Sequence, residues 1–298
     1  MSNDTQTPIN DSRSAIEEQL PKEMLTHTYE IMNRVEDTHW WFAGRRAILE
    51  SFLRQIAEQT EFRGQKTRVG RPGSGDMSDE TGDGPQETGP ESQSLLARIL
   101  DVGCGTGANL EMLSRFGDAE GVDVSDEAIE YCRIKGLKVR KGIAEELPFE
   151  DSAFDLVTAL DVVEHLDDDI SGLKELHRVT RSGGHALVFV PAFMWLWGVQ
   201  DDISHHRIRY TRKQITERLE KAGFTVERAT YANLTFFLPI LAGRVFMRMT
   251  GIKPESENNV NVSALNGLFG KLFGAERHFL KFANLPIGVS IVIVARKY

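Results

Sequence analysis

Short apolar runs alternate with amphipathic segments through most of the last two-thirds of the chain. Runs of this length, bounded by turn residues and separated by helical patterns, are typical of βαβ units around a mainly parallel sheet. The helices between the runs include 126–136, 168–180 and 212–222. The pattern predicts strands at 97–102, 119–123, 137–141, 154–160, 185–191, 225–231 and 287–295. The predicted fold class is therefore α/β, with a doubly wound sheet.

A polar segment, residues 62–95, interrupts the pattern before the first predicted strand. Gly, Pro, Ser, Asp, Glu and Thr dominate it, so it offers little apolar surface to offset the entropy lost on ordering. We therefore predict a disordered linker there. It would separate a helical N-terminal extension, residues 1–61, from the main domain, residues 96–298.

A long insert, residues 233–285, precedes the last predicted strand. It contains two helix-compatible stretches, and in the second the apolar residues recur at i, i+3, i+4, i+7 and i+8, which gives one apolar helix face. These residues are Leu265, Leu268, Phe269, Leu272 and Phe273. The first stretch adds Arg244 and Arg248 on one face. We interpret the insert as a helical lid over the sheet or an acceptor pocket; the sharper hypothesis is contact with a membrane surface or a lipid-linked acceptor.

Charge and cysteine usage narrow the function classes. The formal net charge is -9 and the pI about 5.5, so the chain lacks the basic field that gathers nucleic-acid phosphates, and we expect no nucleic-acid partner. The longest apolar run is far shorter than the ~20 residues that span a bilayer. The two cysteines lack CxxC spacing. We expect a cytoplasmic protein, with peripheral contact at the inner membrane face if the insert binds lipid.

The strongest chemical signal is a glycine-rich turn after the first predicted strand. Gly103, Gly105 and Gly107 stand where that strand gives way to a helix, which is the ligand crevice of an open α/β sheet. Glycine lets the backbone approach a ligand closely, and the helix start favours an anionic group. A dinucleotide fingerprint would be GxGxxG, whereas this turn is GxGxG followed by Ala108. The turn therefore argues less strongly for nicotinamide dinucleotide binding, which stays an alternative.

A second signal is Asp123, at the end of the second predicted strand. An acidic side chain there can accept hydrogen bonds from ribose hydroxyls. The alternative is that Asp123 only caps the helix that begins near Ser125.

Together these elements resemble the motifs of class I S-adenosylmethionine-dependent methyltransferases, and the resemblance extends through most of residues 97–232. It is strongest to the type 11 and type 23-like bacterial enzymes, some of which carry a segment similar to 41–46 before the domain. The resemblance implies a Rossmann-like sheet with its last strand antiparallel, S-adenosyl-L-methionine as cofactor, and methyl transfer as the activity. One departure is Ile143, where many relatives carry an aspartate that binds the adenine amino group. The cofactor-binding residues that the resemblance implies are Asp101, Gly103, Cys104, Gly105, Gly107, Asp123, Val124, Ile143, Ala144, Glu145 and Asp161.

The chemistry of the sulfonium cofactor requires no protein nucleophile, because the methyl group is already activated. A hydroxyl acceptor would benefit from a positioned base. Our candidate catalytic residues are His165, in the fourth-strand motif, and His206 and Tyr210, in a polar loop after the fifth strand. The alternative for that loop is a solvated basic turn in which Thr211 caps the next helix.

We expect no metal ion, because the histidines show no HExxH or comparable spacing and adjacent His205 and His206 point in different directions. The acceptor is not identified by the sequence; a small metabolite and a lipid-linked glycan are both open. Two other functions also stay open: a nicotinamide-dependent oxidoreductase, and a non-catalytic scaffold that binds the cofactor.

Overall fold

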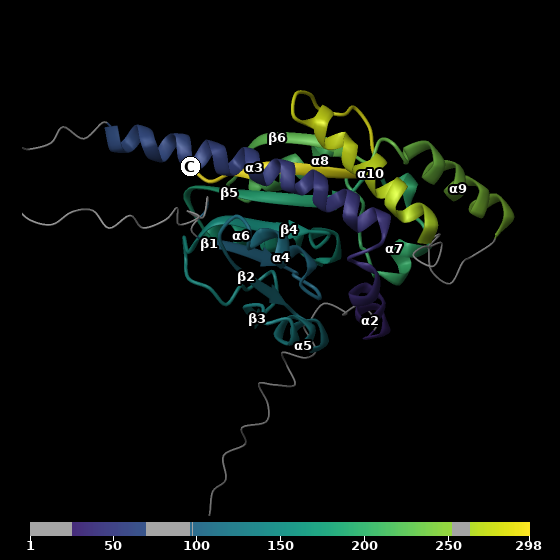
Figure 1. Cartoon of the computed structure of the whole chain (residues 1–298), viewed down its shortest axis with the longest axis horizontal. Helices are drawn as coiled ribbons and strands as arrows, with labels where there is room; N and C mark the ends of the chain where they lie inside the picture. The colour runs from purple at the N-terminus through teal and green to yellow at the C-terminus, as the bar shows by residue number, and fades with distance from the viewer. Residues whose placement is uncertain (1–25, 70–95, 97, 252–262) are drawn as a thin grey trace, which may run out of the picture.

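The computed structural model describes residues 26–69, 96, 98–251 and 263–298. In these ranges a seven-stranded sheet has the order β3-β2-β1-β4-β5-β7-β6 (Figure 1). Neighbouring strands from β3 to β5 are parallel, and β7 is antiparallel to both β5 and β6. The strands are β1 (Arg98–Val102), β2 (Asp118–Asp123), β3 (Val139–Lys141), β4 (Phe154–Leu160), β5 (Thr180–Pro191), β6 (Thr225–Ala232) and β7 (Ser290–Arg296). The prediction of a doubly wound, mainly parallel sheet with an antiparallel last strand is confirmed.

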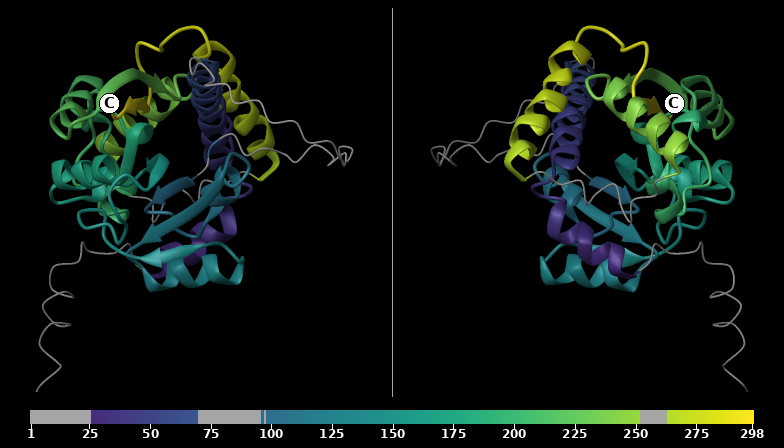
Figure 2. Two further views of the ribbon diagram at one scale, coloured as in Figure 1. Left: turned by 90° about the vertical axis from the view of Figure 1, so that its left-hand side faces the viewer. Right: turned by 90° about the vertical axis from the view of Figure 1, so that its right-hand side faces the viewer.

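Helices cover both faces of this sheet. Helices α3 and α10 lie along one face, and α6 and α8 pack together on the other (Figures 1 and 2). The α-helices are α2 (Thr26–Val35), α3 (Trp40–Val69), α4 (Ala108–Leu113), α5 (Asp126–Ile134), α6 (Asp169–Val179), α7 (Val199–Ile203), α8 (Arg212–Lys221), α9 (Phe237–Thr250) and α10 (Ser263–Leu280). Two short 3₁₀ helices, η1 (Val163–His165) and η2 (Met194–Leu196), follow β4 and β5.

Side-chain caps fix where three of these helices begin. The side chains of Ser125, Asp168 and Thr211 accept hydrogen bonds from backbone N–H groups in the first turns of α5, α6 and α8. Such a cap satisfies a donor that has no partner within the helix. The predicted capping role of Thr211 is confirmed, because it forms a reciprocal capping box with Gln214.

The hydrophobic core joins the sheet to the N-terminal helix. Strands β4 and β7 are buried at every position, as continuous apolar runs in the centre of a covered sheet should be. One side of α3 belongs to the same core, through Ile48, Leu49, Phe52, Leu53 and Ile56. Helix α3 therefore shares one hydrophobic core with the sheet.

The expected domain boundaries need one correction. Helix α3 continues to Val69, so the segment 62–69, which we assigned to a disordered linker, is helical. Its composition includes the helix formers Arg, Gln and Lys, which let a helix continue past the core. The rest of the expected linker, residues 70–95, lies outside the described residues.

The insert before β7 provides α9 and α10. Helix α10 lies alongside α3 (Figure 2), and the two approach closely where Gly44 faces Phe273: a Cβ on Gly44 would lie 2.4 Å from the Phe273 ring. Within the described ranges, no helix is long and apolar enough to cross a membrane.

Candidate functional site

The candidate site lies at the carboxyl ends of β1, β2 and β4. Strand β1 has β2 on one side and β4 on the other, so the chain connections diverge there and open a crevice. A cavity of about 680 Å³ occupies this place, within the ~300–1,000 Å³ that is usual for small-molecule pockets.

The glycine-rich turn forms one wall of the cavity. Gly103 and Gly105 have φ of 67° and 54°, in the left-handed region that glycine adopts without strain. A Cβ on Gly105 would meet only the Met32 methyl group, at 3.8 Å. The backbone of this turn is therefore open to close approach by a ligand.

The carboxylate of Asp123 accepts two backbone hydrogen bonds at that turn. Its Oδ2 accepts from the Gly105 N–H at 2.8 Å and its Oδ1 from the Ser125 N–H at 3.0 Å. The side chain also lines the cavity. Each carboxylate oxygen can accept more than one hydrogen bond, so Asp123 can shape the turn and still accept ribose hydroxyls. The alternative from the sequence, that Asp123 only caps the following helix, is wrong, because Ser125 itself caps α5.

Asp101 lies beneath the turn rather than in the cavity. The Thr158 hydroxyl donates to its Oδ1 at 2.5 Å, and its Oδ2 has no partner among the described residues. Burial raises the pKa of this carboxyl to about 7. Asp101 is thus held by Thr158 of β4, and among the described residues no hydrogen bond joins its side chain to the turn.

The turn at 142–145 lines the cavity in part. Gly142, Ile143 and Ala144 contribute to its wall, whereas Glu145 does not. Burial raises the pKa of the Glu145 carboxyl. The apolar Ile143 side chain stands at the wall, so a base bound there would be held by backbone groups and apolar contact.

Asp161 follows β4 and points toward the N-terminal helix. It has a positive φ of 61°, and Arg45 of α3 donates a hydrogen bond to its Oδ2 and a second one to Asn109. The Arg45 guanidinium lies 4.9 Å from the Trp41 ring centre. Arg45 lies in the segment 41–46 but is not among the site residues predicted from the sequence; the Gly-Arg-Arg sequence before the domain is the signal that could have indicated it.

His165 and His206 meet at the other side of the cavity. Their ring centres are 4.7 Å apart in an edge-to-face arrangement, and both line the cavity. Asp201, which is fully buried, lies 2.8 Å from Nδ1 of His206 and also accepts from Arg209. Burial lowers the pKa of His165 to about 3, so His165 is neutral.

Tyr210 is the candidate that the structure keeps out of the cavity. Its ring is fully buried, and its hydroxyl donates to Asp169 at 2.7 Å. Burial and the neighbouring carboxylate raise the pKa of this hydroxyl. We correct the sequence assignment accordingly: a hydroxyl committed to Asp169 and enclosed by the core cannot reach an acceptor, so Tyr210 joins the loop to α6.

A second part of the cavity lining, here called the aromatic wall, is apolar and mostly aromatic. It comes from α3, α9, α10 and the approach to β7, and its members are Trp40, Trp41, Phe42, Phe236, Pro239, Ile240, Met247, Phe269 and Val289. The cavity therefore joins a backbone-lined half with acidic side chains to an aromatic half.

The structure brings most of the predicted site residues together. Those that line the cavity are Gly103, Cys104, Gly105, Asp123, Val124, Ile143, Ala144, Asp161, His165 and His206. Asp101, Gly107, Glu145 and Tyr210 do not line it. Gly107 instead starts α4, with φ of 95°.

The fold and this crevice define a Rossmann-like protein that binds a nucleoside-containing cofactor at the carboxyl edge of its sheet. A family profile described as a methyltransferase domain matches residues 100–188. The matched segment is similar to the class I S-adenosylmethionine-dependent methyltransferases, whose cofactor is S-adenosyl-L-methionine.

Two curated relatives illustrate the sequence similarity. A ubiquinone biosynthesis O-methyltransferase of Alkalilimnicola ehrlichii is 37% identical over 98 residues, which are 30% of this chain and 40% of that protein. A chloroplastic 2-methyl-6-phytyl-1,4-hydroquinone methyltransferase of Oryza sativa is 31% identical over 138 residues, 44% of this chain and 40% of that protein. The chain thus spans less than half the length of these relatives.

A solved structure shares the fold over nearly the whole chain. A SAM-dependent methyltransferase of Thermotoga maritima is 18% identical, with a TM-score of 0.50; the alignment covers 93% of this chain and all of that one. This similarity supports the fold.

Proposed function

We propose that the chain transfers the methyl group of S-adenosyl-L-methionine to a hydroxyl oxygen of a small acceptor with an apolar or aromatic body. The observation that carries this proposal is that one cavity is lined both by the open glycine turn and by an aromatic wall. The turn and Asp123 would hold the cofactor, which would supply the activated methyl group, and the aromatic wall would enclose the acceptor and keep water from competing.

The names of the relatives agree with this acceptor class. The two curated relatives described above are named for ubiquinone biosynthesis and for a phytyl hydroquinone, and both names indicate six-membered rings with oxygen substituents. The aromatic wall of this chain suits such a ring. A lipid-linked glycan is the other acceptor suggested by the sequence.

We propose that His165 and His206 act on the acceptor hydroxyl. Both imidazoles line the cavity, as that of His39 also does, and Asp201 fixes the orientation of His206. Replacing His206 with Ala should lower kcat by ~10²-fold or more, while S-adenosylhomocysteine affinity stays within twofold. Equal kcat in the variant and the parent would remove His206 from the reaction.

The deciding experiment is calorimetric titration of the purified protein with S-adenosylhomocysteine, with NADH and NADPH in parallel. Binding of S-adenosylhomocysteine alone supports the methyltransferase; binding of a nicotinamide nucleotide alone would overturn it. Transfer of radiolabelled methyl groups to a panel of quinols, phenols and amines then separates an enzyme from a scaffold, which would bind the cofactor without turnover on any of them.

We also propose that the insert contacts a membrane surface while the acceptor enters. Helix α9 exposes large apolar side chains, with Leu238 71%, Phe246 60% and Met249 82% exposed. The expected basic face needs correction, however. Arg244 is buried and 3.6 Å from Asp201, and Arg248 donates to the carbonyls of Trp195 and Trp197, so the contact would be apolar.

Liposome flotation tests this contact. Replacing Phe246 and Met249 with Ser should reduce the fraction that floats with phosphatidylglycerol-containing vesicles. A matched control replaces Ile134, which is 74% exposed on α5, and should leave flotation unchanged. Parent protein that stays entirely in the non-floating fraction would contradict the proposal.

A further inference from the structure

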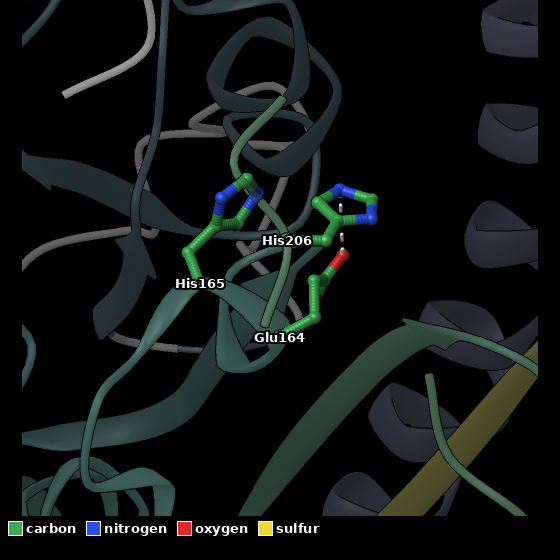
Figure 3. Close-up of side chains that lie close together, drawn as sticks. All are labelled: Glu164, His165 and His206. Atoms are coloured by element: carbon green, nitrogen blue, oxygen red, sulfur yellow. Dashed lines mark ion pairs between the residues drawn. The ribbon is translucent and has the colours of Figure 1, made fainter. Parts of the chain in front are cut away.

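Three side chains that can bind metals converge beside the cavity. Glu164, His165 and His206 each place one ligand atom within 4.8 Å of those of the other two (Figure 3). The first two belong to η1, and His206 comes from the loop after α7. Both histidines line the cavity, so an ion held here would lie at the cavity wall.

Glu164 is the strongest reason to look for an ion. Its side chain is fully buried, and neither of its carboxylate oxygens has a hydrogen-bond partner in the described part of the chain. Its Oε1 is 3.9 Å from Nε2 of His206, too far for a hydrogen bond. A buried carboxylate without partners is costly unless a cation or donors satisfy it.

The spacing of these atoms suits a shared ion. Nitrogen and oxygen ligands about 2.0–2.2 Å from one ion lie roughly 3–3.5 Å from each other. The 3.9 Å between Glu164 and His206 is therefore within a small side-chain adjustment of that separation.

Both imidazoles have the outer contacts expected of metal ligands. Asp201 lies 2.8 Å from Nδ1 of His206, which leaves Nε2 to face Glu164. His165 hydrogen-bonds to the backbone of Ser204. Metal-binding histidines commonly donate their second ring N–H to a carboxylate or a carbonyl, which fixes the ring and the tautomer.

The surrounding charges leave room for a cation. Arg45 is paired with Asp161, and Arg209 with Asp201, which also lies near Arg244. Glu164 has no cationic partner within hydrogen-bonding distance among the described residues.

We propose that Glu164, His165 and His206 bind one divalent transition-metal ion of the Zn²⁺ or Mn²⁺ type. Two imidazoles and one carboxylate suit such ions better than Mg²⁺ or Ca²⁺, which prefer oxygen ligands, and this ligand set leaves positions open for a substrate. The expectation of no metal considered only spacing along the sequence, whereas the fold joins residues that are distant in it. That an acceptor oxygen takes an open position rests on the proposed function; binding of the ion does not.

The test uses the full-length protein after treatment with EDTA and dialysis into metal-free buffer. Calorimetric titration with ZnCl₂ and MnCl₂, with the bound metal counted by mass spectrometry, should give one ion per chain for at least one of them. Replacing Glu164 with Gln should weaken binding at least tenfold, and so should His165→Gln. The matched control is His278→Gln, because His278 is exposed on α10, and it should bind like the parent.

Two results would overturn the proposal: a parent protein that binds neither ion stoichiometrically, or a folded Glu164→Gln variant with parental affinity. Circular dichroism and S-adenosylhomocysteine binding establish folding, and His165→Gln provides the same test if Glu164→Gln fails to fold. Metal binding without methyl transfer would leave this inference standing and count against the proposed function. Methyl transfer that EDTA does not affect, in protein that binds no ion, would overturn this inference and support the proposed function.

Discussion

Arg45 and Asp161 form the contact that joins the N-terminal helix to the site. Both side chains are largely removed from solvent, and burial raises the pKa of Asp161 while Arg45 lowers it. Removing one partner of a buried ion pair leaves the other uncompensated, whereas removing both does not.

The pair can be tested by a double-mutant cycle. Arg45→Ala should lower the free energy of unfolding by about 3 kcal/mol, because Asp161 then stays buried without its cation. Adding Asp161→Asn should restore part of that loss, which is a coupling of at least ~1 kcal/mol. Urea unfolding of the four proteins measures it, and additive losses would contradict the pairing.

The role of Asp123 can be tested through the affinity for the cofactor product. Asp123→Ala should weaken S-adenosylhomocysteine binding by roughly 1–3 kcal/mol, because the Gly105 and Ser125 N–H groups lose their acceptor and the ribose loses its own. Calorimetry provides the measurement. The control is Asp126→Ala, whose side chain is 80% exposed at the start of α5; an equal loss in both variants would remove Asp123 from the site.

His165 makes folding depend on pH. Its pKa is lowered from 6.5 to about 3 in the folded protein, so below pH 6.5 the unfolded chain binds a proton that the folded one does not. Its contribution to stability is constant above about pH 6.5 and falls as the pH drops toward 3. At pH 5 the cost is up to about 2 kcal/mol.

Urea unfolding at pH 7.5 and pH 5, in the presence of EDTA, checks this dependence. The parent should lose up to about 2 kcal/mol more than His165→Gln between the two pH values. An identical loss in both proteins would mean that His165 titrates normally.

At the scale of elements, the sequence predicted regular structure well because local signals agreed with burial. All seven expected strands are present within a few residues, and the central strands β1, β4 and β7 are short apolar runs that a doubly covered sheet buries. The predicted end of α3 was wrong, because the polar residues beyond the core favour neither helix nor coil strongly. Their composition alone favoured a linker.

Packing between α3 and α10 supplies a prediction at this scale. Gly44→Ala should destabilise the protein by about 1–3 kcal/mol, since the new methyl group would overlap the Phe273 ring. Gly267→Ala on α10 is the matched control. A Cβ there meets nothing within 4 Å, so higher helix propensity should make that change neutral or stabilising. Equal thermal unfolding shifts for the two would contradict the packing.

At the scale of the whole molecule, the glycine turn, Asp123 and Asp161 could be predicted because they stand at the carboxyl ends of β1, β2 and β4 and share motif spacing. Glu164 and the aromatic wall could not, since they meet the site only through contacts between distant segments; for Arg45 the Gly-Arg-Arg sequence was the one local signal. Tyr210 was misplaced because sequence position shows that a residue lies in a loop near the site, but not which way its side chain points.

The shared core predicts the behaviour of a truncated chain. A protein lacking residues 1–61 loses the α3 side chains that complete the core, so it should expose apolar surface, bind anilinonaphthalene sulfonate and unfold without a sharp transition. Differential scanning calorimetry checks this. A cooperative transition at the parental Tm would show that residues 96–298 fold independently.

Helix α2 forms part of the cavity wall, so its detachment should limit how fast a bound ligand leaves. Tyr29, Met32 and Glu36 line the cavity, and Lys135 of the main domain pairs with Glu36 at 3.2 Å and donates to the Thr106 carbonyl. Docking of α2 and occupancy of the cavity are then linked, and each stabilises the other by the same free energy. Product would leave at the rate at which this helix detaches, so amide hydrogen exchange in α2 should slow when the cavity is filled.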